Sequence, residues 1–446
     1  MRRCRFALVL TALPLLVLTA CDWTTFRYGP TRTGNNPGET VVGTGNVGQL
    51  VRRWSLDTEA VAGQRLLVGD PVVAHGTVFV PANASDTAGT SVLYARDART
   101  GAASWSTPFE PDPYGRGQQT LSTPAVGNGL VYVGHVGISG IGYGTTYGGG
   151  VTGYRAGTGA LGWNSTFFAG GVSGPALAND RVYASARYST FFLGSFSGLA
   201  AWSAGPSGQS EFLGPHGGPT SADPPVSAPA VTPGVVYSGS EAGNLVAVDA
   251  VGMTNCTPTP SGTPDSFPRG TCTALWSTPT GGRIPATPAV SGGVVYVGSE
   301  DTKLYAIDAD GCGGPTCGPL WTGTTGAAVR SSAAVANGMV YVGSDDGRLY
   351  AFASEGCGSP TCPPRWTAAT GAAIESSPAV ANGVVYVGSD DGRLYAFAAA
   401  GCGAPTCTPL WSYSAGAAVR SSPAVANGMV YVGSEDGRLH AFGLPQ

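Results

Sequence analysis

Short apolar runs recur along this chain at regular intervals. In the most regular copies the runs read Pro-Ala-Val, then Val-Tyr-Val-Gly, then Arg-Leu-Tyr-Ala-Phe. The aromatic residue of the second run falls at Phe79, Tyr132, Tyr183, Tyr237, Tyr296, Tyr341, Tyr386 and Tyr431, and 45 residues separate each of the last four. Periods of this length are typical of propellers, solenoids and repeat arrays.

Each copy predicts four short strands, which we name A, B, C and D in chain order. Strand B is apolar on both sides, as expected of a strand that is buried on both faces. Asn-Gly pairs at Asn337, Asn382 and Asn427 predict tight A–B turns, and Asp-Gly pairs at Asp346, Asp391 and Asp436 predict B–C turns. Strand D carries a tryptophan in seven copies, at Trp54, Trp105, Trp163, Trp276, Trp321, Trp366 and Trp411. In the remaining copy Phe212 takes this place, and Trp202 belongs to strand C.

The repeat predicts an all-β fold, an eight-bladed β-propeller of four-stranded antiparallel blades over residues 45–446. The chain enters at a D strand, around Trp54, and leaves after a C strand that ends near Phe442. The last blade therefore lacks its own D strand, and we expect the N-terminal strand to supply it and close the ring. Residues 22–42 precede the ring and are expected to pack across it.

The amino-acid composition agrees with this fold, and the net charge argues against one class of binding partner. The chain has 70 Gly and 34 Pro, but they recur between apolar runs and so indicate turns rather than disorder. Hydrophobic residues make up 42% of the sequence and charged residues only 11%. A net charge of -4, without a basic stripe, argues against nucleic-acid binding.

The first residues indicate export. Arg2, Arg3 and Arg5 precede an apolar stretch over 6–18, which is too short to span a membrane. The segment Leu18-Thr19-Ala20-Cys21 resembles the lipobox of bacterial lipoproteins, which implies a lipidated Cys21 at the mature N-terminus. An ordinary signal peptide with a chance cysteine is the alternative. We expect a signal peptide at 1–20, a lipid-anchored segment at 21–44 and the propeller at 45–446, outside the cytoplasm and bound to the bacterial cell membrane through lipid only.

Eight further cysteines form four local pairs. We expect disulfides between Cys256 and Cys272, Cys312 and Cys317, Cys357 and Cys362, and Cys402 and Cys407. Each pair lies between two predicted strands, where a hairpin can bring the Cα atoms to the required separation of about 5.5 Å. Each short loop should contribute roughly 2 kcal/mol and the longer one roughly 3 kcal/mol. A zinc site would need two pairs to converge, which separate repeats do not favour.

One segment resembles a known family. Ala95-Arg96-Asp97-Ala98-Arg99-Thr100-Gly101 followed by Trp105 is similar to the tryptophan-docking motif of PQQ-like, quinoprotein-type eight-bladed β-propellers. The stretch after Cys21, Asp22-Trp23-Thr24-Thr25-Phe26-Arg27, resembles the start of exported PQQ-like repeat lipoproteins. The resemblance implies that the strand D tryptophans stack on the next blade. It is specific for fold but not for activity.

An active site is not evident in the sequence. The resemblance implies that a quinoprotein dehydrogenase of this family would carry a disulfide between two adjacent cysteines and a Glu/Asn/Asp set around Ca²⁺. This chain has no adjacent cysteines. His75, His135, His216 and His440 are scattered without metal-ligand spacing. The Gly- and Tyr-rich stretch 135–150 is interpreted as a flexible B–C loop. We therefore expect no catalytic residues, no metal and no cofactor, with PQQ and Ca²⁺ as the alternative.

Charged residues fall where two kinds of connection meet. The D–A loops carry Arg330, Glu375 and Arg420, and the B–C turns carry Asp345, Asp390 and Glu435 among other acids. In a propeller these connections share one face, so we expect a charged rim there. One interpretation is ordinary turn chemistry with surface ion pairs of about 0–1 kcal/mol. The other is a docking face, supplemented by aromatic residues at Tyr143, Tyr147 and 111–114.

Three functions remain open at this point. The first is a non-catalytic, lipid-anchored, monomeric propeller that binds a protein or glycan partner in the cell envelope. The second is a PQQ-dependent, dehydrogenase-like enzyme. The third, a narrower form of the first, is a scaffold subunit of an outer-membrane β-barrel assembly machine. The regular blades favour the first.

Overall fold

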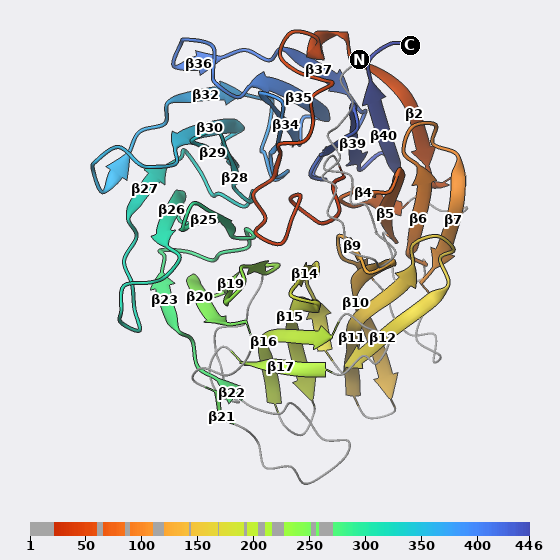
Figure 1. Ribbon diagram of the computed structural model, residues 1–446, viewed down its shortest axis with the longest axis vertical. Helices are drawn as coiled ribbons and strands as arrows, with labels where there is room; N and C mark the ends of the chain where they lie inside the picture. The colour runs from red at the N-terminus through yellow and green to blue at the C-terminus, as the bar shows by residue number, and fades with distance from the viewer. Residues whose placement is uncertain are drawn as a thin grey trace, which may run out of the picture.

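The computed structural model describes residues 22–59, 66–84, 90–109, 120–141, 144–167, 169–190, 194–203, 210–215, 227–250, 256–257 and 271–446. Within these ranges the chain is built from β-strands in sheets of four or five, placed around a common centre (Figure 1). One short 3-10 turn, η1 (Val47–Gln49), precedes the first long strand. None of the helical residues described forms a helix long and apolar enough to cross a membrane.

Four sheets come from the C-terminal half and follow the repeat closely. Their strands in the order A to D are β24 (Ala289–Ser291), β25 (Val294–Ser299), β26 (Lys303–Asp308) and β27 (Trp321–Thr324); β28 (Ala334–Ala336), β29 (Met339–Gly343), β30 (Arg348–Ala353) and β32 (Trp366–Ala369); β33 (Ala379–Ala381), β34 (Val384–Ser389), β35 (Arg393–Ala398) and β37 (Trp411–Ser414); and β38 (Ala424–Ala426), β39 (Met429–Ser434), β40 (Arg438–Gly443) and β2 (Val51–Asp57).

The other sheets are less regular. They contain β4 (Val72–Ala74), β5 (Thr77–Ala84), β6 (Val92–Asp97), β7 (Ala103–Pro108) and the added β3 (Leu66–Val68); β9 (Ala125–Gly127), β10 (Leu130–Ile141), β11 (Gly144–Arg155), β12 (Leu161–Phe167) and the added β8 (Thr120–Leu121); β14 (Ala176–Ala178), β15 (Arg181–Thr190), β16 (Gly194–Ser203), β17 (Ser210–Pro215) and the added β13 (Ala169–Val172); and β18 (Ala230–Val231), β19 (Val235–Gly239), β20 (Asn244–Asp249) and β23 (Trp276–Pro279). A separate pair joins β21 (Cys256–Thr257) to β22 (Thr271–Cys272).

The predicted assignment of strands is confirmed in these sheets, including the irregular copy. Trp202 lies in β16, a C strand, and Phe212 lies in the D strand β17. The N-terminal strand also pairs as expected, because β2 runs antiparallel to β40 with Trp54 opposite Ala441. Strands β34 and β39 are buried at every position, in agreement with neighbours on both faces.

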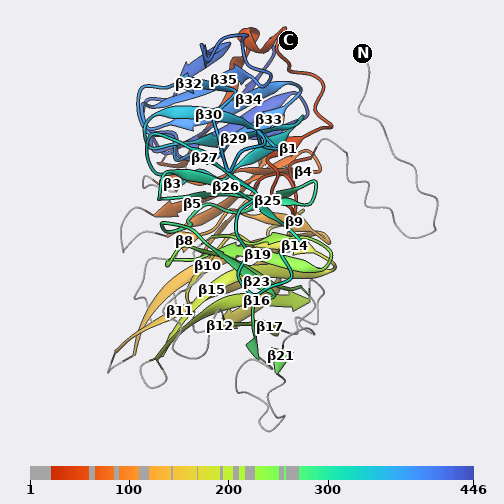
Figure 2. The same ribbon diagram turned by 90° about the vertical axis from the view of Figure 1, so that its left-hand side faces the viewer.

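One expectation was wrong. The stretch 135–150 is not a loop: β10 and β11 pair along their whole length, with Gly144 opposite Ile141. β-Branched and aromatic residues on both strands favour the extended conformation, and the ladder that starts in the sheet continues outward past the glycines between them. In Figure 2 these long strands and β15 extend toward the side opposite β1 and β4.

Neighbouring sheets are joined through the aromatic residue of strand B. Its hydroxyl reaches the C–D connection of the next sheet, as in Tyr341, which donates to the carbonyl of Ala399 at 2.8 Å. The glycine that ends the Val-Tyr-Val-Gly run allows the close approach of that same sheet. A Cβ on Gly343 would lie 2.2 Å from Cγ2 of Ile374, so only glycine fits here. The repeated phrase therefore encodes contacts between sheets as well as strands.

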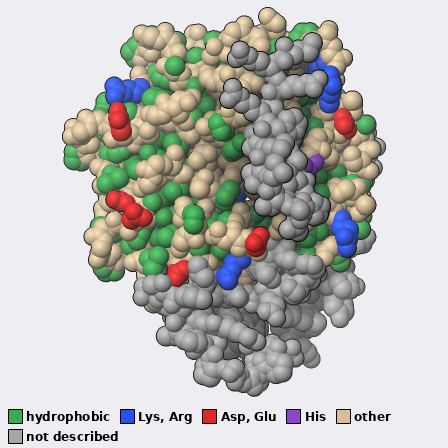
Figure 3. Space-filling model, viewed as in Figure 1, with side chains coloured by type: hydrophobic (Ala, Val, Ile, Leu, Met, Phe, Trp, Pro, Cys, Tyr) green, Lys and Arg blue, Asp and Glu red, His purple; other side chains and the backbone are tan. Residues whose placement is uncertain are grey.

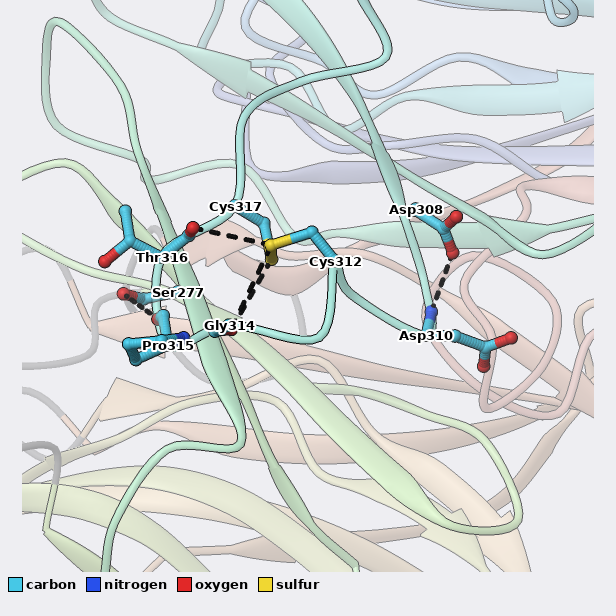
Figure 4. Close-up of a disulfide and its surroundings, with 8 residues drawn as sticks. All are labelled: Ser277, Asp308, Asp310, Cys312, Gly314, Pro315, Thr316 and Cys317. Carbon is cyan, nitrogen blue, oxygen red and sulfur yellow. Dashed lines mark hydrogen bonds between the residues drawn. A yellow bond between two sulfur atoms is a disulfide. The ribbon is translucent and has the colours of Figure 1, made fainter.

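The disulfide loops cover the outer edges of preceding sheets. Cys312–Cys317, Cys357–Cys362 and Cys402–Cys407 are formed, with Cα atoms 5.5 to 5.6 Å apart. Two of these loops add short strands, β31 (Thr361–Cys362) beside β27 and β36 (Thr406–Cys407) beside β32, both parallel. In the third loop the carbonyl of Pro315 accepts a bond from the amide of Ser277 at 2.9 Å (Figure 4). The loops thus protect unpaired strand edges, which the sequence did not reveal.

The N-terminal segment lines the centre of the molecule (Figure 1). It includes β1 (Asn35–Asn36), which pairs in parallel with β33. Its carbonyl groups accept bonds of 2.7 to 2.8 Å from the backbone amide of one valine in each of six A strands, namely Val73, Val126, Val231, Val290, Val335 and Val380. The inner edges of these sheets are therefore paired with residues 23–34 rather than with water.

Candidate functional site

The predicted rim residues are brought together by the fold. Arg330 lies in the connection between β27 and β28 and bridges the B–C turns on its two sides. Its Nε is 3.0 Å from Glu300 Oε1, and its Nη1 contacts the carboxylate of Asp345. Each B–C turn begins with an acid, so an arginine between two turns can bind both. The ion pairs thus link one sheet to the next on this face.

Arg420 makes the most extensive set of contacts on the rim. Its guanidinium lies 2.9 Å from Asp390 Oδ2, 2.8 Å from Glu435 Oε1 and 3.4 Å from Glu375 Oε2. Hydrogen bonding to Asp390 raises the pKa of Arg420, which keeps it charged. The side chain is 48% exposed, so each pair is worth only about 0–1 kcal/mol.

The rim carries more acid than base. Arg283, which pairs with Glu241 at 2.5 Å, is the third arginine in these pairs. Among the described residues of the D–A connections and of the B–C turns, counted with the first residue of each C strand, the acids are Asp57, Glu59, Asp70, Glu241, Glu300, Asp301, Asp345, Asp346, Glu375, Asp390, Asp391, Glu435 and Asp436, against Arg283, Lys303, Arg330, Arg348, Arg393, Arg420 and Arg438. The surface therefore offers unbalanced carboxylates to any partner that approaches it.

The second acid of the B–C turn stabilises the turn by accepting a hydrogen bond from a tyrosine of the following C strand. The hydroxyl of Tyr350 donates to Asp346 Oδ2 at 2.5 Å, and Tyr395 donates to Asp391 at 2.6 Å. Burial and the neighbouring carboxylate raise the pKa of both tyrosines to about 12, so each keeps its proton and remains a donor. These bonds hold the turns that present the rim acids.

A ring of polar side chains lies inside the rim, at the residue just before the Pro (or Ala) that leads into each A strand. The amide of Ser332 donates to Ser377 Oγ at 3.0 Å, and the amide of Ser377 donates to Ser422 Oγ at 3.1 Å. The next member is Asp70, which accepts from the amide of Ser422 and from the hydroxyl of Thr123. Burial raises the pKa of Asp70, and these bonds oppose that rise.

Two arginines of the N-terminal segment occupy the channel below this ring. Arg27 donates to the carbonyls of Pro378 and Ala333, and Arg32 donates to those of Pro229 and Pro175. Both side chains are at most 2% exposed. Burial lowers the pKa of each to about 9, so both stay charged at neutral pH. The guanidinium groups therefore join four sheets through backbone oxygens.

A cavity of about 480 Å³ opens above the ring on the rim face. Its lining includes Asp70, Thr123, Gly174 and Ala228 together with the rim residues Arg420 and Glu435. Gly174 and Ala228 have no hydroxyl at the position that Ser377 and Ser422 occupy elsewhere, and both line the cavity. The lining of the cavity is mixed, because apolar residues such as Leu67 and Leu121 stand beside the carboxylates of Asp70 and Glu435.

The described residues do not fit PQQ with Ca²⁺. Calcium takes six to eight oxygen ligands, usually including several carboxylates. In the cavity both oxygens of Asp70 already accept hydrogen bonds. Nowhere in the described ranges do three or more His, Cys, Asp or Glu side chains gather as a metal-binding group. The donor set that the fold family implies is thus not supplied by these residues.

The predicted tryptophan positions lie against the next sheet where the structure describes both partners. Trp54 packs on Gly101, Trp105 on Gly159 and Trp321 on Gly356. Each of these glycines has a positive φ in a C–D connection, and a Cβ there would lie 2.6 to 2.7 Å from an indole atom. Trp276 and Trp366 meet Gly311 and Gly401 in the same way. Trp163 contacts Tyr132 and is buried, and the Trp411 indole donates to Leu50.

Some predicted residues lie beyond what the structure describes. Cys21, Tyr143 and residues 111–114 are outside the described ranges, as is the side chain of Tyr147. Cys256 and Cys272 stand opposite each other in the β21–β22 pair, and their disulfide stays a prediction. The sequence analysis missed Asp70, Arg27 and Arg32. Asp70 could have been found, because Asp70-Pro71 aligns with Ser422-Pro423 in the repeat.

Comparison with known proteins now decides the family. A sequence model described as "Outer membrane protein assembly factor BamB", built on PQQ-like repeats, matches residues 88–252, 266–357, 315–401 and 360–443. The chain belongs to this PQQ-like repeat family. None of the curated proteins matches it significantly.

Solved structures show the same fold at low identity. The PQQ-like repeat chain is similar to the quinohemoprotein alcohol dehydrogenase ADHIIG from Pseudomonas putida HK5, with a TM-score of 0.65, 14% identity, and coverage of 95% of this chain and 80% of that one. A europium-containing methanol dehydrogenase gives a TM-score of 0.61 at 13% identity, over 95% and 98% of the two chains. BamB from Moraxella catarrhalis gives 0.57 at 14% identity, over 88% and 99%. Such identities establish the propeller fold alone.

Proposed function

We propose that this protein is an exported, lipid-anchored, non-catalytic β-propeller that binds an envelope partner through its charged rim. In this proposal the eight sheets of residues 45–446 form one closed, monomeric ring, with β2 as the outer strand of the last blade. Contacts between the last and first sheets support closure, because Tyr431 donates to Ala98 at 2.8 Å. Residues 1–20 are the signal peptide, and 21–44 begin at the lipidated Cys21.

The observation that carries the binding proposal is the concentration of charge on one face. Only 11% of the chain is charged, yet thirteen acids and seven bases of the described residues lie in the rim connections, where Arg283, Arg330 and Arg420 pair with six of the carboxylates. The cavity opens on the same face. Because the acids are in excess, we expect a protein partner with a basic segment, since charge complementarity favours specific docking. A glycan is the alternative partner.

Capture from solubilised membranes tests this proposal. The triple variant Arg330→Glu, Glu375→Arg and Arg420→Glu changes the charge pattern of the rim without touching the core. The matched control is Arg99→Glu, which changes the net charge by the same amount as the rim variant but at the opposite end of the sheets. We expect the rim variant to lose a partner that the wild type and the control retain. Equal recovery by all three proteins would refute rim docking.

A narrower form of the proposal is an assembly scaffold. It is favoured by the description of the family model, an outer membrane protein assembly factor. If it holds, the captured partner is a component of an outer-membrane β-barrel assembly machine. Recovery of a different envelope protein, or a host without an outer membrane, would leave the general proposal and remove this form.

A further inference from the structure

The first described residue is fixed to the body of the protein. Asp22 is 5% exposed, and its carboxylate accepts a bond of 2.9 Å from the amide of His75. Asn427 reaches the other oxygen at 3.5 Å. His75 and Asn427 both lie in A–B turns, on two different sheets. The described part of the chain therefore begins at the A–B end of the sheets, where residue 22 is already held by two of them.

The next residue is bound just as firmly. Trp23 is 2% exposed, and its carbonyl accepts from the amide of Val73 at 2.7 Å. Consecutive Cα atoms are about 3.8 Å apart, so Cys21 can be no farther than that from the fixed Asp22. A lipid on Cys21 would thus be joined to the folded body without a flexible linker, and the protein could not rotate freely at the membrane surface.

Charge distinguishes the two ends of the sheets. At the rim end the first acids of the B–C turns outnumber the arginines, while each second acid is followed two residues later by a base such as Lys303 or Arg348. The A–B and C–D end is close to neutral, with Arg52, Arg53, Arg99, Arg155 and Arg365 beside Asp97, Asp180, Asp308, Asp310 and Glu355. Figure 3, which views this end, shows charged side chains scattered singly or in small groups. An anionic bilayer would repel the rim end and not this one.

We propose that the A–B and C–D end is held flat against the lipid surface, so that the rim and its cavity point away from the membrane. The occupant of this face is the bilayer itself. This inference rests on the proposed lipid anchor at Cys21. The direct attachment at Asp22 supplies the orientation, and the acidic excess on the rim reinforces it within a Debye length of about 10 Å. The long β10–β11 pair also extends toward the rim side, away from the lipid (Figure 2).

Site-specific fluorescence in vesicles tests the orientation. Arg99→Cys and Arg348→Cys are a matched pair, because both replace an exposed arginine, one in a C–D turn and one at the start of β30 directly after a B–C turn, at opposite ends of the sheets. Each lipidated protein is labelled at the new cysteine and reconstituted into vesicles of phosphatidylethanolamine and phosphatidylglycerol that contain a headgroup quencher. We expect severalfold stronger quenching at position 99 than at position 348. Equal quenching, or the reverse order, would overturn the proposal.

A linker variant separates tether geometry from surface affinity. Inserting ten Gly/Ser residues between Cys21 and Asp22 adds a flexible span of about 17–19 Å. If the short tether orients the protein, this variant should lose most of the difference between the two labels. An unchanged difference would refute the tether as its cause.

The anchor itself is checked separately. Mass spectrometry of the mature N-terminus should show a diacylglyceryl group on Cys21, and Cys21→Ala should leave the membrane fraction. Absence of the lipid would refute the anchor. Presence of the lipid with equal quenching at both labels would refute only the orientation.

Discussion

At the scale of single residues, the hydroxyl of the strand B tyrosine bonds to the next sheet in several repeats but not at Tyr386. Tyr237, Tyr296 and Tyr341 donate to carbonyls of the next sheet, at 2.9, 2.9 and 2.8 Å. The hydroxyl of Tyr386 is buried and has no partner among the described residues. The reason is that the sheet it faces has no C–D connection, because its D strand comes from the N-terminus.

This difference makes a paired prediction. Tyr341→Phe leaves the buried carbonyl of Ala399 unpaired, and we expect it to lower the free energy of unfolding by about 1–2 kcal/mol. Tyr386→Phe removes a hydroxyl that has no partner, so stability should be unchanged or higher. Denaturant unfolding of both variants against the wild type measures the difference. Equal losses would contradict the assignment of these hydroxyls.

His135 predicts a dependence of stability on pH. Its ring lies 4.7 Å from that of Phe109, and burial lowers its pKa to about 4. An unfolded histidine has a pKa near 6.5, so between these values the unfolded chain binds a proton that the folded chain does not. Stability should therefore fall as the pH drops from about 6.5 to about 4, by roughly 3 kcal/mol from this group.

The variant His135→Phe tests this origin. Phenylalanine keeps a ring against Phe109 but cannot take up a proton. The difference in unfolding free energy between wild type and variant, measured from pH 7 to pH 4, should change with pH in the direction that penalises the wild type at low pH. A constant difference would show that His135 does not titrate on unfolding.

At the scale of elements, the disulfide loops work between sheets as well as within their own. The loop closed by Cys357 and Cys362 adds β31 to the edge of β27, and the loop closed by Cys402 and Cys407 adds β36 to β32. The repeated frame Gly-Cys-Gly-X-Pro-Thr-Cys predicted the bonds but not this second contact. A loop that covers an edge leaves no unpaired strand there for another chain.

Removal of one disulfide should weaken the neighbouring sheet that its loop covers. Replacing Cys357 and Cys362 by serine should reduce stability by roughly 2 kcal/mol, the value for a short loop. Amide exchange should accelerate at Thr322 in β27, whose amide donates to Pro360 at 2.8 Å. The same exchange at Thr367 in β32 serves as the internal control, because its partner Pro405 belongs to the intact loop. Faster exchange at Thr367 alone would contradict the proposal that the Cys357–Cys362 loop protects the edge of β27.

At the scale of the whole molecule, the N-terminal segment joins sheets that are far apart in sequence. Arg27 contacts carbonyls that precede β28 and β33, and Arg32 contacts those that precede β14 and β18. Backbone bonds from residues 23–34 reach six A strands. The centre is thus held by one continuous segment rather than by the sheets alone.

Loss of both arginines should weaken the whole assembly. The double variant Arg27→Met and Arg32→Met leaves buried carbonyls without donors, and we expect the free energy of unfolding to fall by roughly 2–4 kcal/mol. The transition should also broaden, since sheets held less firmly at the centre unfold less cooperatively. The exposed control Arg99→Met should change stability by less than about 0.5 kcal/mol. Identical thermal transitions for all three proteins would refute this role.

The repeat by itself determined the strand order, the turn positions, the local cysteine pairs and the pairing of β2 with β40, because period and turn chemistry are local properties of the sequence. It also placed Arg330, Glu375 and Arg420 on one face, since propeller topology sends alternate connections to opposite ends. Only the tertiary structure decided what fills the centre and what covers the edges. Arg27 and Asp70 gain their surroundings from residues hundreds of positions away, and burial among distant carbonyls leaves no local pattern in the chain.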